Sequence, residues 1–129
     1  MDNKLFQVSI KGLIIKENKI LLLHEKKDTW DLPGGRLQHG ESFEQTLERE
    51  CEEEMGVKCE VLDKQPTFSW IAEDSIGNWR VMLCFRIKLE HFNFRYSDEC
   101  IGYDFFNKST INTINVVPQI KRLKEFLQS

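Results

Sequence analysis

The sequence predicts an α/β protein in which a mixed β-sheet lies between helices. Three observations support this prediction. Apolar and β-branched runs typical of strands occur on both sides of the centre of the chain. A helix with clear boundaries lies between these runs, and an amphipathic segment near the C-terminus predicts a closing helix. The order of strands, helix, strands and helix is typical of a sheet covered by helices.

The N-terminal part of the chain predicts two strands and a loop. Residues 6–23 contain two apolar runs separated by the turn signal "KEN", and the run "ILLL" is expected to be buried on both faces. Residues 30–40, "WDLPGGRLQHG", hold one proline and three glycines, and we expect them to form a loop.

Residues 43–55 are framed as a helix from both ends. Ser42 with Gln45 three residues later forms a capping-box pattern. Gly56 suits the position directly after the last helical turn. The helix is therefore expected to run from Phe43 to Met55.

The second half of the chain predicts a hairpin, a loop and the closing helix. Residues 59–74 and 79–91 are expected to form two long strands joined by "SIGN". Residues 96–104 form a polar loop, and "YDFF" at its end forms a short strand. The closing helix covers residues 118–128, where Pro118 suits the first turn. Its core face is supplied by Ile120, Leu123 and either Phe126 or Leu127.

Length and composition predict one soluble globular domain, residues 1–129. The chain is 40% hydrophobic and 30% charged and carries no repeats or linkers. No apolar run approaches the length of about 18 residues that a transmembrane helix needs, and the N-terminus lacks the apolar core of a secretory signal. A cytoplasmic, reducing location is expected, because no CxxC pair or zinc-like spacing relates the cysteines, Cys51, Cys59, Cys84 and Cys100.

The negative charge of the chain is local. Residues 41–54 hold seven glutamates and one arginine, a net charge of −6, whereas the whole chain carries −3, so the remainder carries about +3. An acidic site in a mildly basic protein suits a metal ion and an anionic small-molecule substrate. The surplus is too small to indicate nucleic-acid binding. The protein is expected to be a monomer or a homodimer.

The glutamates of the predicted helix fall on two faces. At 3.6 residues per turn, Phe43 and Leu47 begin an apolar stripe. Glu50 and Glu54 lie within about 20° of the direction of Phe43, with Glu53 on their flank. The face that packs on the core in the first two turns therefore carries carboxylates in the last two. The other glutamates are expected to be solvated: Glu44, Glu48 and Glu52.

Three carboxylates converging on one point favour a hard divalent cation. Magnesium prefers oxygen ligands and commonly bridges to phosphate oxygens. A glutamate that is not a ligand can accept a proton from the attacking water. Gly34 and Gly35 in the preceding loop let the backbone approach a metal or an anion without a Cβ in the way.

At these spacings, residues 35–57 resemble the Nudix box of the Nudix (MutT-type) hydrolases. Val57 fits the last apolar position, Cys51 stands where an aliphatic residue is usual, and the preceding "WDLPGG" looks like the family's lead-in to the box. All seven invariant-type positions match: Gly35, Glu41, Arg49, Glu50, Glu53, Glu54 and Gly56.

The resemblance implies the Nudix fold, a mixed sheet between helices with the box as loop–helix–loop. It also implies hydrolysis, with Mg²⁺ or Mn²⁺, of a nucleoside diphosphate linked to another moiety. By position, the implied metal ligands are Glu50, Glu53, Glu54 and a backbone carbonyl of the Gly34–Gly35 turn, with Gly35 as the named residue. Arg49 is expected to orient the carboxylates, Glu41 to brace the loop, and Gly56 to serve a structural role in the box.

The general base stays open between two glutamates. The family varies in this position, so Glu50 and Glu99 are rivals, and the expected catalytic group is Glu50, Glu53, Arg49 and Glu99. Glu99 precedes Phe105 by six positions in "DECIGYDFF". Family members often place a further carboxylate in such a loop, and Asp98 is the neighbouring alternative.

The expected substrate is a nucleoside triphosphate, which the protein hydrolyses as a pyrophosphohydrolase. Gly34, Gly35, Arg36 and Trp70 are the candidates for substrate binding, because an aromatic face can stack on any base. The proline about fifteen residues past the box that marks ADP-ribose hydrolases is missing. ADP-ribose, nucleotide sugars and dinucleoside polyphosphates remain the alternatives. A non-catalytic nucleotide sensor and an RNA-end hydrolase are the rival classes. The intact glutamate set counts against the sensor, and the weak basic surplus counts against the RNA-end hydrolase.

Overall fold

The computed structural model describes residues 5–128, so the ends of the predicted domain, residues 1–4 and 129, lie outside the described part. The larger of two sheets is centred on the long strand β8. The whole length of β1 pairs with β8 in parallel. β5 pairs with the other edge of β1, while β7 and β6 pair with successive parts of β8. The bounds are β1 (Gln7–Leu13), β5 (Gly34–Arg36), β6 (Cys59–Val61), β7 (Phe68–Glu73) and β8 (Trp79–Leu89).

The smaller sheet is built on β3, which pairs with β2, β4 and β9, all antiparallel. The predicted turn "KEN" is confirmed: Glu17 and Asn18 both have a left-handed backbone, with φ of 53° and 63°. The first predicted strand, however, divides at Ile14, and its two parts join different sheets. The bounds are β2 (Ile15–Lys16), β3 (Lys19–Glu25), β4 (Trp30–Asp31) and β9 (Cys100–Phe106).

The helix α1 (Phe43–Met55) has the predicted boundaries at both ends. The Ser42 hydroxyl accepts a hydrogen bond from the Gln45 N–H at 3.1 Å, and the Gln45 side chain accepts one from the Ser42 N–H at 2.9 Å. Gly56 takes a left-handed conformation with φ of 67° and donates its N–H to the Glu52 carbonyl at 3.0 Å. Local sequence therefore determines this helix.

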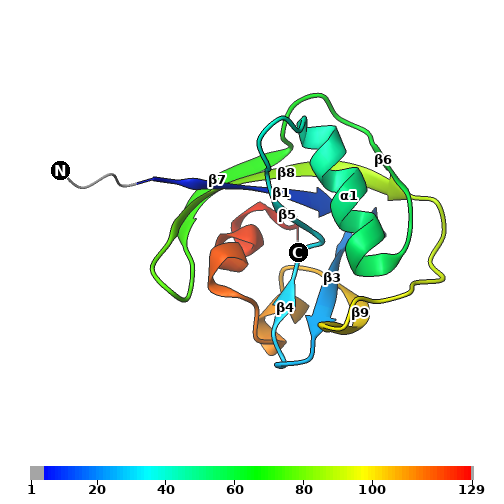
Figure 1. Ribbon diagram of the computed structural model, residues 1–129. Helices are drawn as coiled ribbons and strands as arrows, with labels where there is room; N and C mark the ends of the chain where they lie inside the picture. The colour runs from blue at the N-terminus through cyan, green and yellow to red at the C-terminus, as the bar shows by residue number, and fades with distance from the viewer. Residues whose placement is uncertain (1–4, 129) are drawn as a thin grey trace.

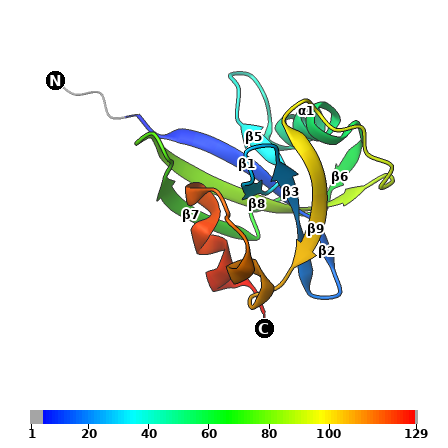
Figure 2. The same ribbon diagram turned by 90° about the horizontal axis from the view of Figure 1, so that it is seen from below.

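The sheets lie between two helical layers, which confirms the predicted α/β class. In Figure 2, α1 lies on one side of the strands and the orange-to-red C-terminal segment lies on the other. Two clusters of buried residues correspond to these layers. One contains Leu47, Cys51 and Met55 of α1, and the other contains Ile120 and Leu123 of the C-terminal segment. In the described part of the chain, no helix is long and apolar enough to cross a membrane.

The closing helix is correct in position and wrong in type. The C-terminal segment forms the 3₁₀ helices η1 (Thr110–Thr113) and η2 (Pro118–Phe126) instead of an α-helix. Ile120, Leu123 and Phe126 recur every third residue, which matches the three residues per turn of a 3₁₀ helix. Ile120 and Leu123 are fully buried.

Three further predictions need correction. The first long strand of the hairpin is broken into β6 and β7. Residues 63–66 lie outside the ladder with β8, between the bonds of the Leu62 and Thr67 N–H groups to β8, and Pro66 among them has no N–H to donate. Residues 30–40 are not wholly a loop, since β4 and β5 lie within them. The polar loop expected at residues 96–104 ends early, because β9 begins at Cys100 and pairs with β3.

Candidate active site

The site begins where the glycine turn packs against α1. Figure 1 shows α1 beside β1 and β5. Gly34 has φ of +123°, and a Cβ there would collide with the backbone of Ile10 on β1. A Cβ on Gly35 would collide with the carboxylate of Glu50. Gly34 is therefore needed for the turn to fit beside β1, while a side chain at position 35 would displace the Glu50 carboxylate.

Glu54 faces this turn. Its Oε1 accepts a hydrogen bond from the Gly34 N–H at 2.8 Å. Burial is the main reason that the pKa of Glu54 is raised to about 8, and the charges of Glu50 and Asp31 raise it further. The positive charge of Lys11 and the Gly34 N–H act in the opposite direction. Without a cation, Glu54 therefore holds a proton at neutral pH.

Arg49 connects the carboxylates of the box. Its guanidinium donates two hydrogen bonds to Glu41, from Nε at 2.8 Å and from Nη2 at 3.1 Å. Its Nη1 donates to Glu50 at 2.9 Å. The contact with Glu53 is longer, at 3.4 Å, and the Glu53 side chain is 60% exposed. The hydrogen bonds from Arg49 are the main reason that the pKa of Glu41 is lowered to about 2. Arg49 thus holds Glu41 and Glu50 more firmly than Glu53.

One cavity of about 390 Å³ contains the three predicted ligand carboxylates. The loop from β8 to β9 reaches it because the Arg95 and Ser97 N–H groups donate to the Met55 and Glu54 carbonyls at the end of α1. This places Glu99, predicted from its spacing to Phe105, on the wall of the same cavity. The lining residues are Leu23, Glu25, Glu50, Glu53, Glu54, Ser97, Asp98, Glu99 and Cys100.

None of the predicted substrate-binding residues lines this cavity: Gly34 and Gly35 pack against Glu54 and Glu50, and Trp70 and Arg36 lie elsewhere. Trp70 is 5% exposed, its Nε1 donates to the Gln119 carbonyl at 2.8 Å, and its ring stacks on Phe126. It is therefore a core residue, and its choice as a base-stacking residue is wrong. Arg36 has an exposed side chain that does not line the cavity, and only its carbonyl contacts the box, through Arg49 at 3.2 Å.

Two residues at the site were missed. Glu25, at the end of β3, lines the cavity, and one of its oxygens accepts the Thr29 hydroxyl at 2.6 Å. Lys11, in the middle of β1, is 5% exposed, and the charges of Asp31, Glu54 and Glu50 raise its pKa even though burial lowers it. A signal for Lys11 was present, since a lysine inside the apolar run "VSIKGLII" is unusual in a buried strand.

The donors suit a hard divalent cation. Glu50, Glu53 and Glu54 line one cavity and offer carboxylate oxygens, and the glycine turn packs against Glu54 and Glu50. Across residues 5–128, no three His, Cys, Asp or Glu side chains are already gathered closely enough to form a metal cluster. A cation would therefore draw the carboxylates together, and it would replace the proton on Glu54.

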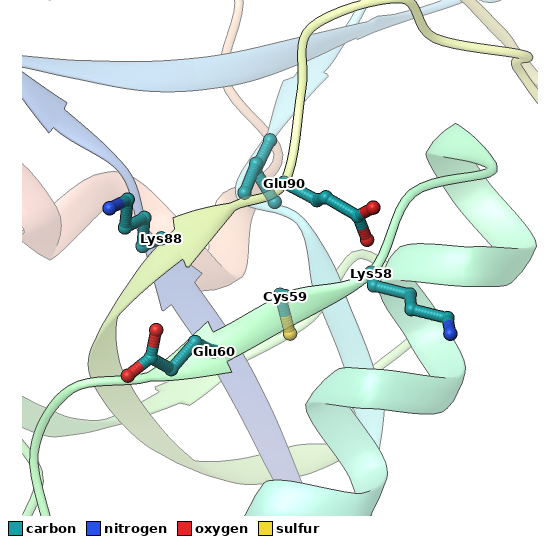
Figure 3. Close-up of a pocket in the computed structure, with 6 residues that line it drawn as sticks. Lys58, Cys59, Glu60, Lys88 and Glu90 are labelled. Atoms are coloured by element: carbon teal, nitrogen blue, oxygen red, sulfur yellow. The ribbon is translucent and has the colours of Figure 1, made fainter.

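A second cavity, of about 380 Å³, lies at the edge formed by β6 and the end of β8. It has a different character, because its charges are two lysines and two glutamates. Figure 3 shows that their side chains spread apart instead of converging on one point. The labelled residues are Lys58, Cys59, Glu60, Lys88 and Glu90.

Comparison with known proteins identifies the family. The family model described as the NUDIX domain matches residues 5–125. The chain belongs to the NUDIX family. The fold agrees with the crystal structure of the MutT protein from Methanosarcina mazei Go1, with a TM-score of 0.74 at 21% identity, covering 98% of this chain and 93% of that one. The matched range includes residues 35–57, which resemble the Nudix box.

Two curated relatives match shorter segments. An 8-oxo-dGTP diphosphatase of Buchnera aphidicola subsp. Schizaphis graminum is 40% identical over 52 residues, which are 36% of this chain and 40% of the relative. An ADP-ribose pyrophosphatase of Methanocaldococcus jannaschii is 43% identical over 54 residues, which are 39% of this chain and 32% of the relative. The matches thus span two fifths or less of either relative.

Proposed function

We propose that this NUDIX hydrolase is a Mg²⁺-dependent pyrophosphohydrolase of nucleoside triphosphates, with Mn²⁺ as the alternative cation. The observations that support it most are the cavity lined by Glu50, Glu53 and Glu54 and the packing of the Gly34–Gly35 turn against Glu54 and Glu50. The name of the Buchnera relative, an 8-oxo-dGTP diphosphatase, supports a nucleoside triphosphate as the substrate.

In this proposal Glu50, Glu53 and Glu54 hold the cation together with a backbone carbonyl of the glycine turn. A bound Mg²⁺ supplies charge neutralisation at the phosphate oxygens and lowers the pKa of a water molecule. Arg49 and Glu41 fix the direction of Glu50, since the guanidinium binds both. The protein's contribution is to supply these oxygen donors from one helix, with Glu50 already held by Arg49.

Glu99 is the better candidate for the general base. One oxygen of Glu50 already accepts a hydrogen bond from Arg49 at 2.9 Å, which suits a ligand held in a fixed direction. Glu99 lines the same cavity, on the loop whose Arg95 and Ser97 N–H groups bond to the end of α1. We therefore assign proton abstraction to Glu99, with Glu50 as a ligand.

We also place the reaction in the cytoplasm. All four cysteines belong to the described residues and carry free thiols. Free thiols persist in a reducing compartment.

A substrate panel tests the proposal. Phosphate and pyrophosphate release are measured with nucleoside triphosphates, ADP-ribose, UDP-glucose, dinucleoside polyphosphates and capped RNA, each with Mg²⁺ and with EDTA. Pyrophosphate release from a nucleoside triphosphate that stops in EDTA supports the proposal. Preference for ADP-ribose would move the substrate to the class named for the Methanocaldococcus relative. Nucleotide binding without hydrolysis of any substrate would indicate a sensor.

A further inference from the structure

The buried ammonium group of Lys11 contacts the glycine turn. Lys11 sits in the middle of β1, and its ammonium donates to Asp31 Oδ2 at 3.2 Å, to the Leu32 carbonyl at 3.2 Å and to the Gly34 carbonyl at 3.3 Å. An ammonium group has three N–H donors, so these contacts use them all. The side chain of Lys11 is 7% exposed and that of Asp31 is 16% exposed.

These contacts fix both sides of Gly34. Its carbonyl accepts from Lys11, while its N–H donates to Glu54 Oε1 at 2.8 Å. The peptide before it is also held, because the Gly12 N–H donates to the Pro33 carbonyl at 2.8 Å. Gly34 thus lies between the Lys11 ammonium group and the carboxylate of Glu54, and the orientation of Gly34 depends on both.

Stability alone gives no reason for a lysine at this position. Burying two charges costs desolvation, and well-packed apolar residues in place of a buried ion pair are often as stable or more so. What the pair provides is direction, since Asp31 and two carbonyls must all point at one nitrogen. That requirement sets the path of residues 31–34 immediately before the Nudix box.

We propose that Lys11 is a positioning residue that holds the Gly34 turn and Glu54 in place for the divalent cation. The proposal rests on the metal site of the proposed function. Lys11 does not touch the substrate or the cation, and it acts through the Gly34 peptide. Groups of this kind, one step removed from the ligands, typically change metal affinity by about 10–100-fold when they are lost.

The test compares two ion pairs of the same chain. Lys11→Met keeps the length of the side chain and removes its charge and donors. Arg80→Met is the matched control. Arg80 lies on β8 opposite Gln7, the first residue of β1. It pairs with Asp74 at 2.9 Å, and the side chains of Arg80 and Asp74 are 21% and 5% exposed. For each metal-free protein, the melting temperature is measured, and Mn²⁺ binding is titrated by electron paramagnetic resonance without substrate.

Both variants are expected to melt at a lower temperature, and only Lys11→Met is expected to bind Mn²⁺ more weakly, by about 10–100-fold. The direction of the change is diagnostic when the titration is made above the pKa of Glu54, where loss of the Lys11 charge does not act through the proton on that carboxyl. If Lys11 acted only as a nearby positive charge, its removal would tighten cation binding, because like charges repel. Unchanged or tighter Mn²⁺ binding by Lys11→Met would therefore overturn the positioning role, and so would equal weakening in Arg80→Met.

A second variant covers loss of folding. If Lys11→Met does not fold, the double variant Lys11→Met, Asp31→Asn removes both buried charges together, so that neither is left unpaired. The same weakening is expected, and wild-type affinity would overturn the role. Failure of the wild-type protein to bind Mn²⁺ would remove the metal site itself. Wild-type binding with an unaffected variant would remove only the role of Lys11.

Discussion

Binding of a divalent cation should displace a proton from Glu54. In the metal-free protein the pKa of this carboxyl is about 8, because it is buried beside Glu50 and Asp31. A metal binds the ionised form, so below pH 8 the proton must leave first. Apparent metal affinity is therefore expected to rise with pH until the pH passes the pKa of Glu54.

The size of this effect follows from the ionised fraction. With a pKa of about 8, about 1% of Glu54 is ionised at pH 6 and about half at pH 8. If only the ionised form binds, affinity for the cation increases about 50-fold over these two pH units. An ordinary glutamate, with a pKa of 4.5, is almost fully ionised over the whole range and produces almost no change.

Calorimetric titration of Mn²⁺ at pH 6, 7 and 8 measures this change. Two buffers with different ionisation enthalpies report the protons released. Glu54→Gln should bind more weakly and lose most of the pH dependence, since an amide does not titrate. A wild-type affinity that stays flat between pH 6 and 8, with no proton release, would refute a raised pKa at Glu54.

Four further predictions concern the same site. Glu53→Gln should lower kcat by about 10²-fold if the ligand charge stabilises the transition state by roughly 3 kcal/mol, whereas Glu44→Gln on the solvated face should match the wild type in steady-state assays. Glu99→Gln should lower kcat by about 10²–10⁴-fold with partial recovery at high pH, and a near-normal kcat would return the role of base to Glu50. In metal-free protein, the melting temperature should fall as pH rises from about 5 to 8, because folded Glu54 binds its proton more tightly than the unfolded chain does, and a flat profile would contradict this. Glu41, whose folded pKa is about 2, should stabilise the fold above its ordinary value of 4.5 and lose that effect as pH falls toward 2, and Glu41→Gln should remove this acid-side loss from the melting curve.

The parts of the fold that sequence predicts well are those determined locally. The helix α1 starts and ends where its capping box and Gly56 indicate, because these residues satisfy the helix ends by themselves. Strand β9 begins three residues before the predicted strand "YDFF", because Gly102 directly before it is a poor strand former. Pairing with β3 supplies the ladder that the preference of Gly102 does not.

The site divides in the same way. The box glutamates come from one helix, so helical spacing was enough to group Glu50, Glu53 and Glu54. Trp70 and Lys11 depend on neighbours distant in sequence. Trp70 is covered by η2, where its hydrogen-bond partner Gln119 lies 49 residues later in the chain. The burial of Lys11 depends on the Gly34 carbonyl, which the pairing of β1 with β5 brings near. Residue type alone suggests an exposed side chain for a lysine and stacking on a substrate base for a tryptophan. In the folded chain both side chains are buried.

Metal add-back tests the central claim most directly. Metal-free protein is mixed with a nucleoside triphosphate, and pyrophosphate is followed before and after Mg²⁺ is added, in the wild type and in Glu53→Gln. The account predicts no pyrophosphate before addition, steady release after it in the wild type, and release slower by about 10²-fold in the variant. Equal release before and after Mg²⁺, or equal rates in the two proteins, would contradict a cation held by the carboxylates of α1.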